Sequence, residues 1–409
     1  MAKLRSIIRV CGRVLLTLLF IVMFAVLATS ISVIYDFAPS KPFSGPDIYN
    51  PYASFDPEVS WKRTTLHTHT RVAGPLNECE YDAMEVYRRY AEFGYDIVGI
   101  SNHNEITPHP AGMSQHVNMY EHGYNLRNFH KLVIGSEDVN RFDALFPLFA
   151  SQAQWQLDML ASECDVLQLN HPSRSSLLDR DKLSSIAGYD IMELSGVTAH
   201  LENVQWDWAL SAGRYSFGLL NDDLHFPDRS DKFAVRCSYL CSPSDSAEDL
   251  VATLRSGCFY AMRIPDYGNG DWEVKRAMNG SLPSITNIGM CGDTIYLKLS
   301  EPASLIRVIG ENHRLLARAV ETDSLAYRMG VEDSYARVVV SYPDSLIIMT
   351  NPFARYDAQT MSSPGDVVLY SRNVVKTVLY NIGVVALVVV LVWLYVKIVR
   401  RWREKQMVS

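Results

Sequence analysis

Side chains that bind metal ions follow one short apolar segment after another in this chain. They are His67 and His69 in LHTHT, His103 after DIVGIS, Glu137 at the end of KLVIGSE, His171 after DVLQLN, and Asp223 and His225 after FGLLN. Imidazole and carboxylate groups are common protein ligands of zinc, manganese and iron. The spacing indicates one metal site assembled from several segments.

The first two histidines form an H-x-H pair. Residues two apart on an extended strand point to the same face, so His67 and His69 can hold one ion together. A single pair is weak evidence, because lone histidines are usually hydrogen-bonded or surface residues. The repetition after successive segments is much harder to explain by chance, and it favours a metal centre.

The apolar segments alternate with amphipathic stretches between residues 61 and 260. We expect helices at 81–93 and 152–162, and strands at 96–101, 130–137, 165–170, 190–196 and 215–221. Repeated strand and helix units favour an α/β fold with a parallel sheet or barrel. Sites in such barrels lie at the carboxyl ends of the strands, which would bring all seven side chains to one rim. After residue 270 short alternating strands predict a small antiparallel sheet or sandwich.

The motif order resembles that of the polymerase and histidinol phosphatase (PHP) family. The matching segments are HTH at 67–69, SNHN at 101–104, GSE at 135–137, NHP at 170–172 and DLH at 223–225. The resemblance implies a distorted (β/α)7 barrel that holds one to three divalent ions of zinc, manganese or iron. LRSGCFYA (254–261) and the strands ending near residue 353 resemble a metallohydrolase branch in which a small β domain follows the barrel.

The resemblance also implies individual roles. One ion would be held by His67, His69, Glu137 and Asp223, a second by Glu137 and His171, and a third by His103 and His225. Hydroxide between two ions bridged by Glu137 would be the nucleophile. Arg174, in HPSR, could clamp a phosphate, and the catalytic residues would be Glu137, His225 and Arg174.

The chain departs from the family pattern at several positions. No histidine lies between Glu137 and His171, where many members have a ligand. Gly74 stands where an acidic residue is common, with Glu78 as a possible substitute, and Asn102 replaces an aspartate. We assign Glu121 to a polar insertion (105–129) that could form a lid, and treat the histidines within it as loop residues: His109, His116 and His122. Trp206 and Trp208 could stack on a substrate or pack in the core.

Two uncharged apolar segments, 14–34 and 377–396, are each long enough to span a bilayer. A signal peptide is the alternative for the first. Lys and Arg lie before the first segment and after the second, so both termini should be cytoplasmic. We expect a two-pass protein of the cytoplasmic (inner) membrane with a periplasmic domain.

Net charge and cysteine spacing exclude other functions. The chain carries −7 and its first and last 13 residues +4 each, which leaves −15 for the rest. An acidic external domain is unsuited to nucleic acid. Cys237 and Cys241 lack a second pair for a thiolate metal site, so the external cysteines should be buried thiols or disulfides.

The expected organisation has eight parts: basic tail 1–13, transmembrane helix 14–34, linker 35–60, barrel 61–265, β domain 266–360, linker 361–376, transmembrane helix 377–396 and basic tail 397–409. We expect a membrane-anchored metal-dependent hydrolase whose small-molecule substrate is a phosphate ester. Hydrolysis of an amide, ester or carbamate is the alternative chemistry. A non-catalytic, metal-stabilised binding domain is the alternative of another class.

Overall fold

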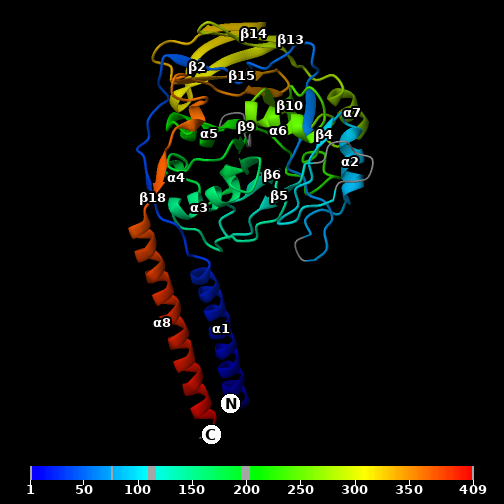
Figure 1. Ribbon diagram of the computed structural model, residues 1–409. Helices are drawn as coiled ribbons and strands as arrows, with labels where there is room; N and C mark the ends of the chain where they lie inside the picture. Colours follow the sequence, from blue (N-terminus) through cyan, green and yellow to red (C-terminus); the bar gives the residue numbers. More distant parts are fainter. Residues whose placement is uncertain (1, 75–76, 109–116, 195–202, 408–409) are drawn as a thin grey trace.

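The computed structural model describes residues 2–74, 77–108, 117–194 and 203–407. The chain forms a mixed α/β globular part, from which two long helices leave side by side (Figure 1). Its strands assemble into a two-stranded, a five-stranded and an eleven-stranded sheet.

The five-stranded sheet has the order β5 (Met119–His122), β6 (Lys131–Ile134), β7 (Val166–Leu169), β8 (Ile191–Glu193), β9 (Phe217–Leu219). Every residue of these strands is buried. Strands β7, β8 and β9 are parallel, whereas β6 runs antiparallel to both β5 and β7. The apolar sides of α3 (Ala150–Ala161) and α5 (Val204–Ser211) pack into the core beside this sheet.

The eleven-stranded sheet joins the early strands to the C-terminal ones. Its main path is β12 (Ile285–Cys291), β13 (Thr294–Gly310), β15 (Tyr335–Ser341), β16 (Ile347–Thr350), β11 (Phe259–Arg263), β10 (Arg236–Leu240), β3 (Lys62–Thr65), β4 (Ile97–Val98). Strand β14 (Arg314–Arg328) pairs with β13, β17 (Phe353–Tyr356) with β15, and β2 (Asp47–Tyr49) with β17. The C-terminal strands therefore continue the sheet through the β11–β16 pair instead of forming a separate sandwich.

The remaining helices of the globular part are short. They are α2 (Ala83–Ala91), α4 (Arg180–Leu183), α6 (Ala247–Ser256) and α7 (Trp272–Asn279), with single 3₁₀ turns at Pro172–Arg174, Glu311–His313 and Pro364–Asp366. Helix α2 begins with a capping box, in which Asp82 accepts from the Glu85 N–H and Glu85 accepts from the Asp82 N–H. This cap fixes where the chain turns into the helix after the H-x-H segment.

Two isolated bridges connect the sheets. Thr68, beyond β3, pairs with Leu224, beyond β9, and His103, beyond β4, pairs with Glu121 in β5. Strands β3 to β9 thus follow one another through ladders or single bridges, but the described residues form no continuous closed barrel. The α/β class is as expected, and the seven-stranded closure is not shown.

The local expectations can be compared with the elements directly. The five strands expected between residues 96 and 221 contain β4, β6, β7, β8 and β9, and the two expected helices are α2 and α3. Strand β5 is not among the expected strands, because it lies within the stretch 105–129 that is expected to be an insertion. The expected linkers are also partly ordered: β1 (Tyr35–Phe37) pairs with β18 (Tyr370–Arg372), and β2 joins the large sheet. All seven cysteines are free thiols.

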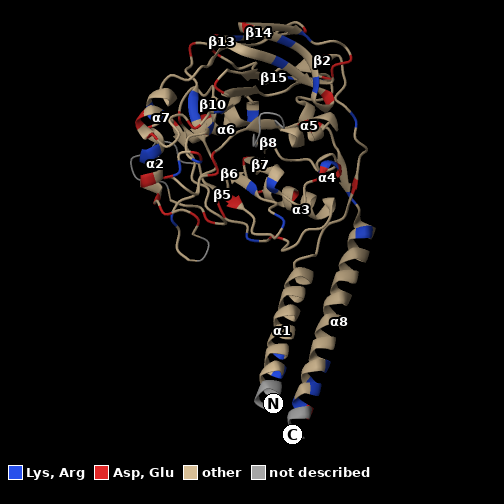
Figure 2. Cartoon of the chain, turned by 180° about the vertical axis from the view of Figure 1, so that it is seen from behind, with Lys and Arg blue, Asp and Glu red and all other residues tan. Residues whose placement is uncertain are grey.

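Helices α1 (Ala2–Ala28) and α8 (Val374–Met407) contain the two apolar segments. Both are long and apolar enough to cross a membrane, a property that signal sequences share with membrane spans. The two helices touch: the rings of Phe20 and Tyr395 stack with centroids 4.0 Å apart, and Thr17 Oγ1 lies 3.0 Å from the Tyr395 hydroxyl. Lys and Arg gather near their free ends (Figure 2).

A buried ion pair connects α5 to the large sheet. Asp207 accepts two hydrogen bonds from the Arg337 guanidinium, 2.9 Å from Nε and 2.7 Å from an Nη, and one from the Tyr335 hydroxyl at 3.0 Å. Both charged side chains are buried. Burial opposes the charged form of Asp207, but the arginine outweighs it, so the pKa of Asp207 lies below its usual value.

We expect Asp207→Ala to destabilise the protein by about 3–5 kcal/mol, because it removes the carboxylate that balances the buried Arg337 charge. Asp323→Ala removes one side of an exposed ion pair with Lys298 and should leave stability nearly unchanged. Thermal unfolding of both variants in detergent would measure the difference. Equal melting temperatures for the two variants would contradict the role given to the buried pair.

Candidate metal centre

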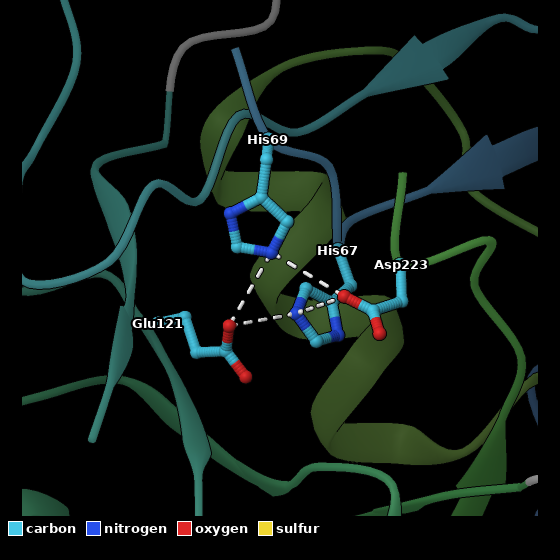
Figure 3. A group of neighbouring side chains, drawn as sticks. All are labelled: His67, His69, Glu121 and Asp223. Carbon is cyan, nitrogen blue, oxygen red and sulfur yellow. Dashed lines mark ion pairs between the residues drawn. The ribbon is translucent and has the colours of Figure 1, made fainter. Parts of the chain in front are cut away.

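Four side chains from different segments meet at one point: His67, His69, Glu121 and Asp223 (Figure 3). Nε2 of His67 lies 3.1 Å from Oε2 of Glu121 and 3.2 Å from Oδ1 of Asp223. Nε2 of His69 lies 3.3 Å from each of the same two oxygens. All four side chains are buried.

The isolated bridges place these residues. The Thr68–Leu224 bridge, with a hydrogen bond from the His69 N–H to the Leu224 carbonyl at 3.1 Å, sets the H-x-H segment beside Asp223. The bridge from His103 to Glu121 includes a 2.8 Å hydrogen bond from the Asn104 N–H to the Glu121 carbonyl. The chain therefore brings ligands together where two sheets meet.

The Glu121 carboxylate faces two groups of imidazoles. Its Oε2 is directed at His67, His69 and, at 3.0 Å, His103. Its Oε1 lies 3.2 Å from Nδ1 of His130 and 3.1 Å from Nε2 of His171. A carboxylate with one oxygen toward each group has the position of a bridge between two cation sites.

A third group surrounds Glu78. Its Oε2 lies 3.1 Å from Nε2 of His103, 3.3 Å from Nε2 of His225 and 3.7 Å from Nδ1 of His69. Glu78 is about one-third exposed, so this group lies nearer to solvent than Glu121. It supplies the carboxylate that Gly74 could not.

A second row of hydrogen bonds orients the ligands. Nδ1 of His67 lies 3.0 Å from Oε1 of Glu193, which leaves Nε2 free to bind a cation. The same carboxylate accepts from the His171 N–H at 2.8 Å and from Asn221 at 3.1 Å. His171 and Asp223 have positive φ angles of 24° and 53°. Such a backbone conformation costs about 1–3 kcal/mol per residue, and it persists only because surrounding contacts stabilise it.

The buried atoms at the centre fit a cation. Nε2 of His67, Nε2 of His69 and Oδ1 of Asp223 make no hydrogen bond of acceptable geometry within the described part of the chain. Orphaned buried polar atoms are rare. Bonds of about 2.0–2.2 Å from one ion to its ligands place neighbouring ligand atoms roughly 3–3.5 Å apart, as these atoms are.

The charges of the centre also favour a bound cation. Burial disfavours a charged His67, but Glu121 and Glu193 outweigh it and raise its pKa to about 10. Burial lowers the pKa of His69 to about 4. Burial also opposes ionisation of Glu193, yet His67 brings its pKa down to about 2. The carboxylates therefore stay ionised and demand positive charge, which protons or metal ions can supply.

A pocket of about 430 Å³ opens beside the centre. Its lining includes His171, Asp223 and His225 of the centre together with the basic residues Arg174, Lys232 and Arg236. The Arg174 guanidinium, about half exposed, donates to Oδ2 of Asp223, the oxygen turned away from the H-x-H pair. Cationic side chains thus border the space that a substrate would enter.

The structure does not place Glu137 at the centre. This side chain is exposed and lines another pocket, of about 600 Å³, together with Asp165 and Glu248. The reason is strand direction: β6 runs antiparallel to β7, so its carboxyl end lies at the opposite edge of the sheet. The expected placement of Glu137 at the centre is therefore corrected, and Glu121 lies between the two groups of imidazoles instead.

The other expected site residues come together: His67, His69, His103, His171, Asp223 and His225. Sequence reasoning missed Glu121, near the end of β5, and His130, directly before β6. A recognisable signal was present, since the last residues of one hairpin strand and the first of the next share an edge. His130 adds an imidazole to the centre from a position before Glu137 in the chain.

The remaining candidates have structural roles or lie elsewhere. His122 is buried, with Nε2 3.0 Å from the Phe142 carbonyl, and Asn102 accepts from the Thr70 N–H at 2.8 Å. Trp206 is buried and donates to the Ser216 carbonyl, so it belongs to the core. His109 and His116 lie outside the described residues. No cysteine is among the candidate metal groups of the described chain.

Comparison with known proteins adds one distant likeness. No protein-family model and no curated protein matches the sequence. A solved two-domain protein of Bacteroides vulgatus, described as containing a predicted PHP-like metal-dependent phosphoesterase, aligns with 76% of this chain and 98% of its own. The two share 12% identity with a TM-score of 0.36.

We expect Glu121→Gln to lose most of its bound metal, because the change keeps the side chain's volume but removes the charge shared by the two imidazole groups. Loss of even an outer partner of a ligand weakens metal affinity by about 10–100-fold. Glu137→Gln is the matched control and should keep its metal. Elemental analysis of the purified full-length variants would show the difference. Unchanged stoichiometry in Glu121→Gln, or loss in Glu137→Gln, would contradict the assignment.

Proposed function

We propose that this chain is a membrane-anchored, metal-dependent hydrolase that acts on a phosphate ester outside the cytoplasm. The observation that carries the proposal is the convergence of unpartnered ligand atoms from His67, His69 and Asp223 on Glu121. Zinc, manganese or iron would suit this mixed set of imidazoles and carboxylates. Such ions supply an acidified water and stabilise charge on a substrate oxygen.

The protein's own residues would divide the remaining work. His67 and His69, with Glu121 and Asp223, would hold the first ion. Glu121 would also serve a second with His130 and His171, and Glu78, His103 and His225 would form the most exposed site. Glu193 keeps His67 in the tautomer that presents Nε2.

Charge at the pocket favours a phosphate ester over a carbonyl substrate. Arg174, Lys232 and Arg236 line the pocket beside the histidines. Guanidinium groups bind phosphate oxygens strongly and stabilise the charge that spreads over them during transfer. An uncharged amide, ester or carbamate offers no comparable partner for three cations.

The non-catalytic alternative loses its main support. It rested on the aspartate that Asn102 replaces and on a missing ligand. His130 adds an imidazole 3.2 Å from Oε1 of Glu121, and Glu78 adds a carboxylate 3.1 Å from Nε2 of His103. The third departure, Asn102, is buried and hydrogen-bonded to Thr70, so it supports the backbone beside the centre.

We further propose that strands β3–β9 are a distorted barrel that opens where the isolated bridges replace ladders.

We expect Arg174→Ala to lower kcat/KM for a chromogenic phosphomonoester by about 10²-fold, the usual cost of one preorganised electrostatic group. The inhibition constant of inorganic phosphate should rise too, while hydrolysis of a carboxylic ester should change little. Arg180→Ala, at an exposed arginine that contacts Asn312, is the control. Equal losses on both ester types would instead mean that Arg174 acts only by holding Asp223.

Basic residues at the free ends of both helices predict cytoplasmic termini. An alkaline phosphatase reporter fused after Ser60 should be active, and a β-galactosidase reporter at the same point should be inactive. After Met407, the alkaline phosphatase reporter should be inactive and the β-galactosidase reporter active. Swapped activities at either position would overturn the proposed topology.

A further inference from the structure

Exposed apolar side chains gather on the side of the globular part from which α1 leaves. Leu126 is 63% exposed and Leu148 55%, and Ile31, Tyr124 and Phe146 are also exposed. We call these five residues the helix-side patch. Figure 1 shows the segment between β6 and α3, which contains Phe146 and Leu148, near the end of α1.

Hydrogen bonds tie the segments of the patch to one another and to the end of α1. The Leu126 N–H donates to the Leu145 carbonyl at 2.9 Å, and the Leu145 N–H donates to Oγ1 of Thr29 at 3.1 Å. Helix α1 ends at Ala28, one residue earlier. The segments that carry the patch are therefore attached to the end of α1.

Helix α8 meets the same region. The Tyr380 hydroxyl donates to the Ser30 carbonyl at 2.8 Å, and Gln152 of α3 donates to the same oxygen at 3.3 Å. The Phe149 and Tyr380 rings lie edge to face with centroids 5.5 Å apart. These contacts fix the height of the patch relative to both helices.

The composition of the patch suits the boundary between lipid and water. Tyrosine, phenylalanine and leucine beside arginine are typical of segments that lie in a membrane interface. Arg127 stands 5.3 Å from the centre of the Phe146 ring, and the Tyr124 hydroxyl donates to the Arg141 carbonyl. Exposed apolar clusters of this kind otherwise mark interaction sites.

We propose that the helix-side patch is immersed in the interfacial layer of the bilayer that α1 and α8 span. The inference rests on the membrane anchoring in the proposed function and goes beyond it, since two helices alone would not require the globular part to touch lipid. A second copy of the chain could cover the same residues, but it would not explain why the patch is bonded to the helix ends.

The helix-side patch is also linked to the metal centre through the chain. Tyr124 and Leu126 lie in the β5–β6 connection, whose two ends carry Glu121 and His130. In the same connection, the Arg127 carbonyl accepts from Ser175, the residue after Arg174, at 2.9 Å. Contact of this connection with lipid would hold the centre close to the bilayer surface.

Quenching of tryptophan by brominated lipid tests the proposal. The full chain would be placed, one copy each, in phosphatidylcholine nanodiscs whose acyl chains are plain or brominated near the headgroup. Leu126→Trp and Leu148→Trp would each be made together with Trp393→Phe and Trp402→Phe, which remove the tryptophans of α8. Val331→Trp in the same background is the control, since Val331 is exposed in the β14–β15 connection. The wild type, with Trp393, reports on the span itself.

We expect bromine to remove most of the emission added at positions 126 and 148 and none of that added at 331. If the added emission is unchanged while wild-type emission from α8 is quenched, the patch proposal is wrong and the anchor stands. A blue shift seen only when several copies share one membrane would assign the patch to a second copy and also overturn it. If α8 itself is not quenched, both the anchor and the patch fail.

Discussion

The Glu121 carboxylate is almost fully buried and lies within 3.0–3.3 Å of five imidazoles. A charge withdrawn from water must be balanced nearby or it neutralises. Neutral imidazoles cannot balance it, and Glu193 and Asp223 add further negative charge in the same space. The arrangement is stable when positive charge enters, and this requirement explains why the unpartnered atoms of His67, His69 and Asp223 lie close together.

The same requirement explains why the sheets are joined by single bridges near the centre. Where ladders end, β3 and β4 approach β9 and β5 only through the single bridges at Thr68 and His103. A regular ladder would bury backbone there, whereas the bridges leave room for side chains to turn inward. His67, His103 and Asp223 accordingly come from residues just beyond the strands, whereas Glu121 lies within β5.

How much the sequence could predict depended on whether each residue's place is set locally. His67, His69, His103, His171 and Asp223 follow short apolar segments, and that local pattern was enough to group them. Glu137 has the same pattern, but β6 runs against its neighbours, and strand direction is decided by pairing partners far along the chain. Glu121 was overlooked because β5 is four residues long and follows a polar stretch. The joining of C-terminal strands to β11 likewise depends on distant pairing that hydrophobic alternation does not encode.

The pairing of β1 with β18 clamps the two connections at the place where they enter the helices. Tyr35 and Tyr370 both donate to Asp158 of α3, at 2.7 Å, so the clamp is fastened to the globular part as well. With the proposed anchoring, a globular part carried by two adjacent helices would neither tumble freely nor leave the membrane surface. In a bilayer its metal centre would move only within a thin layer at constant height. Encounters with a substrate would then depend on lateral diffusion and on the number of substrate molecules per unit area rather than per unit volume.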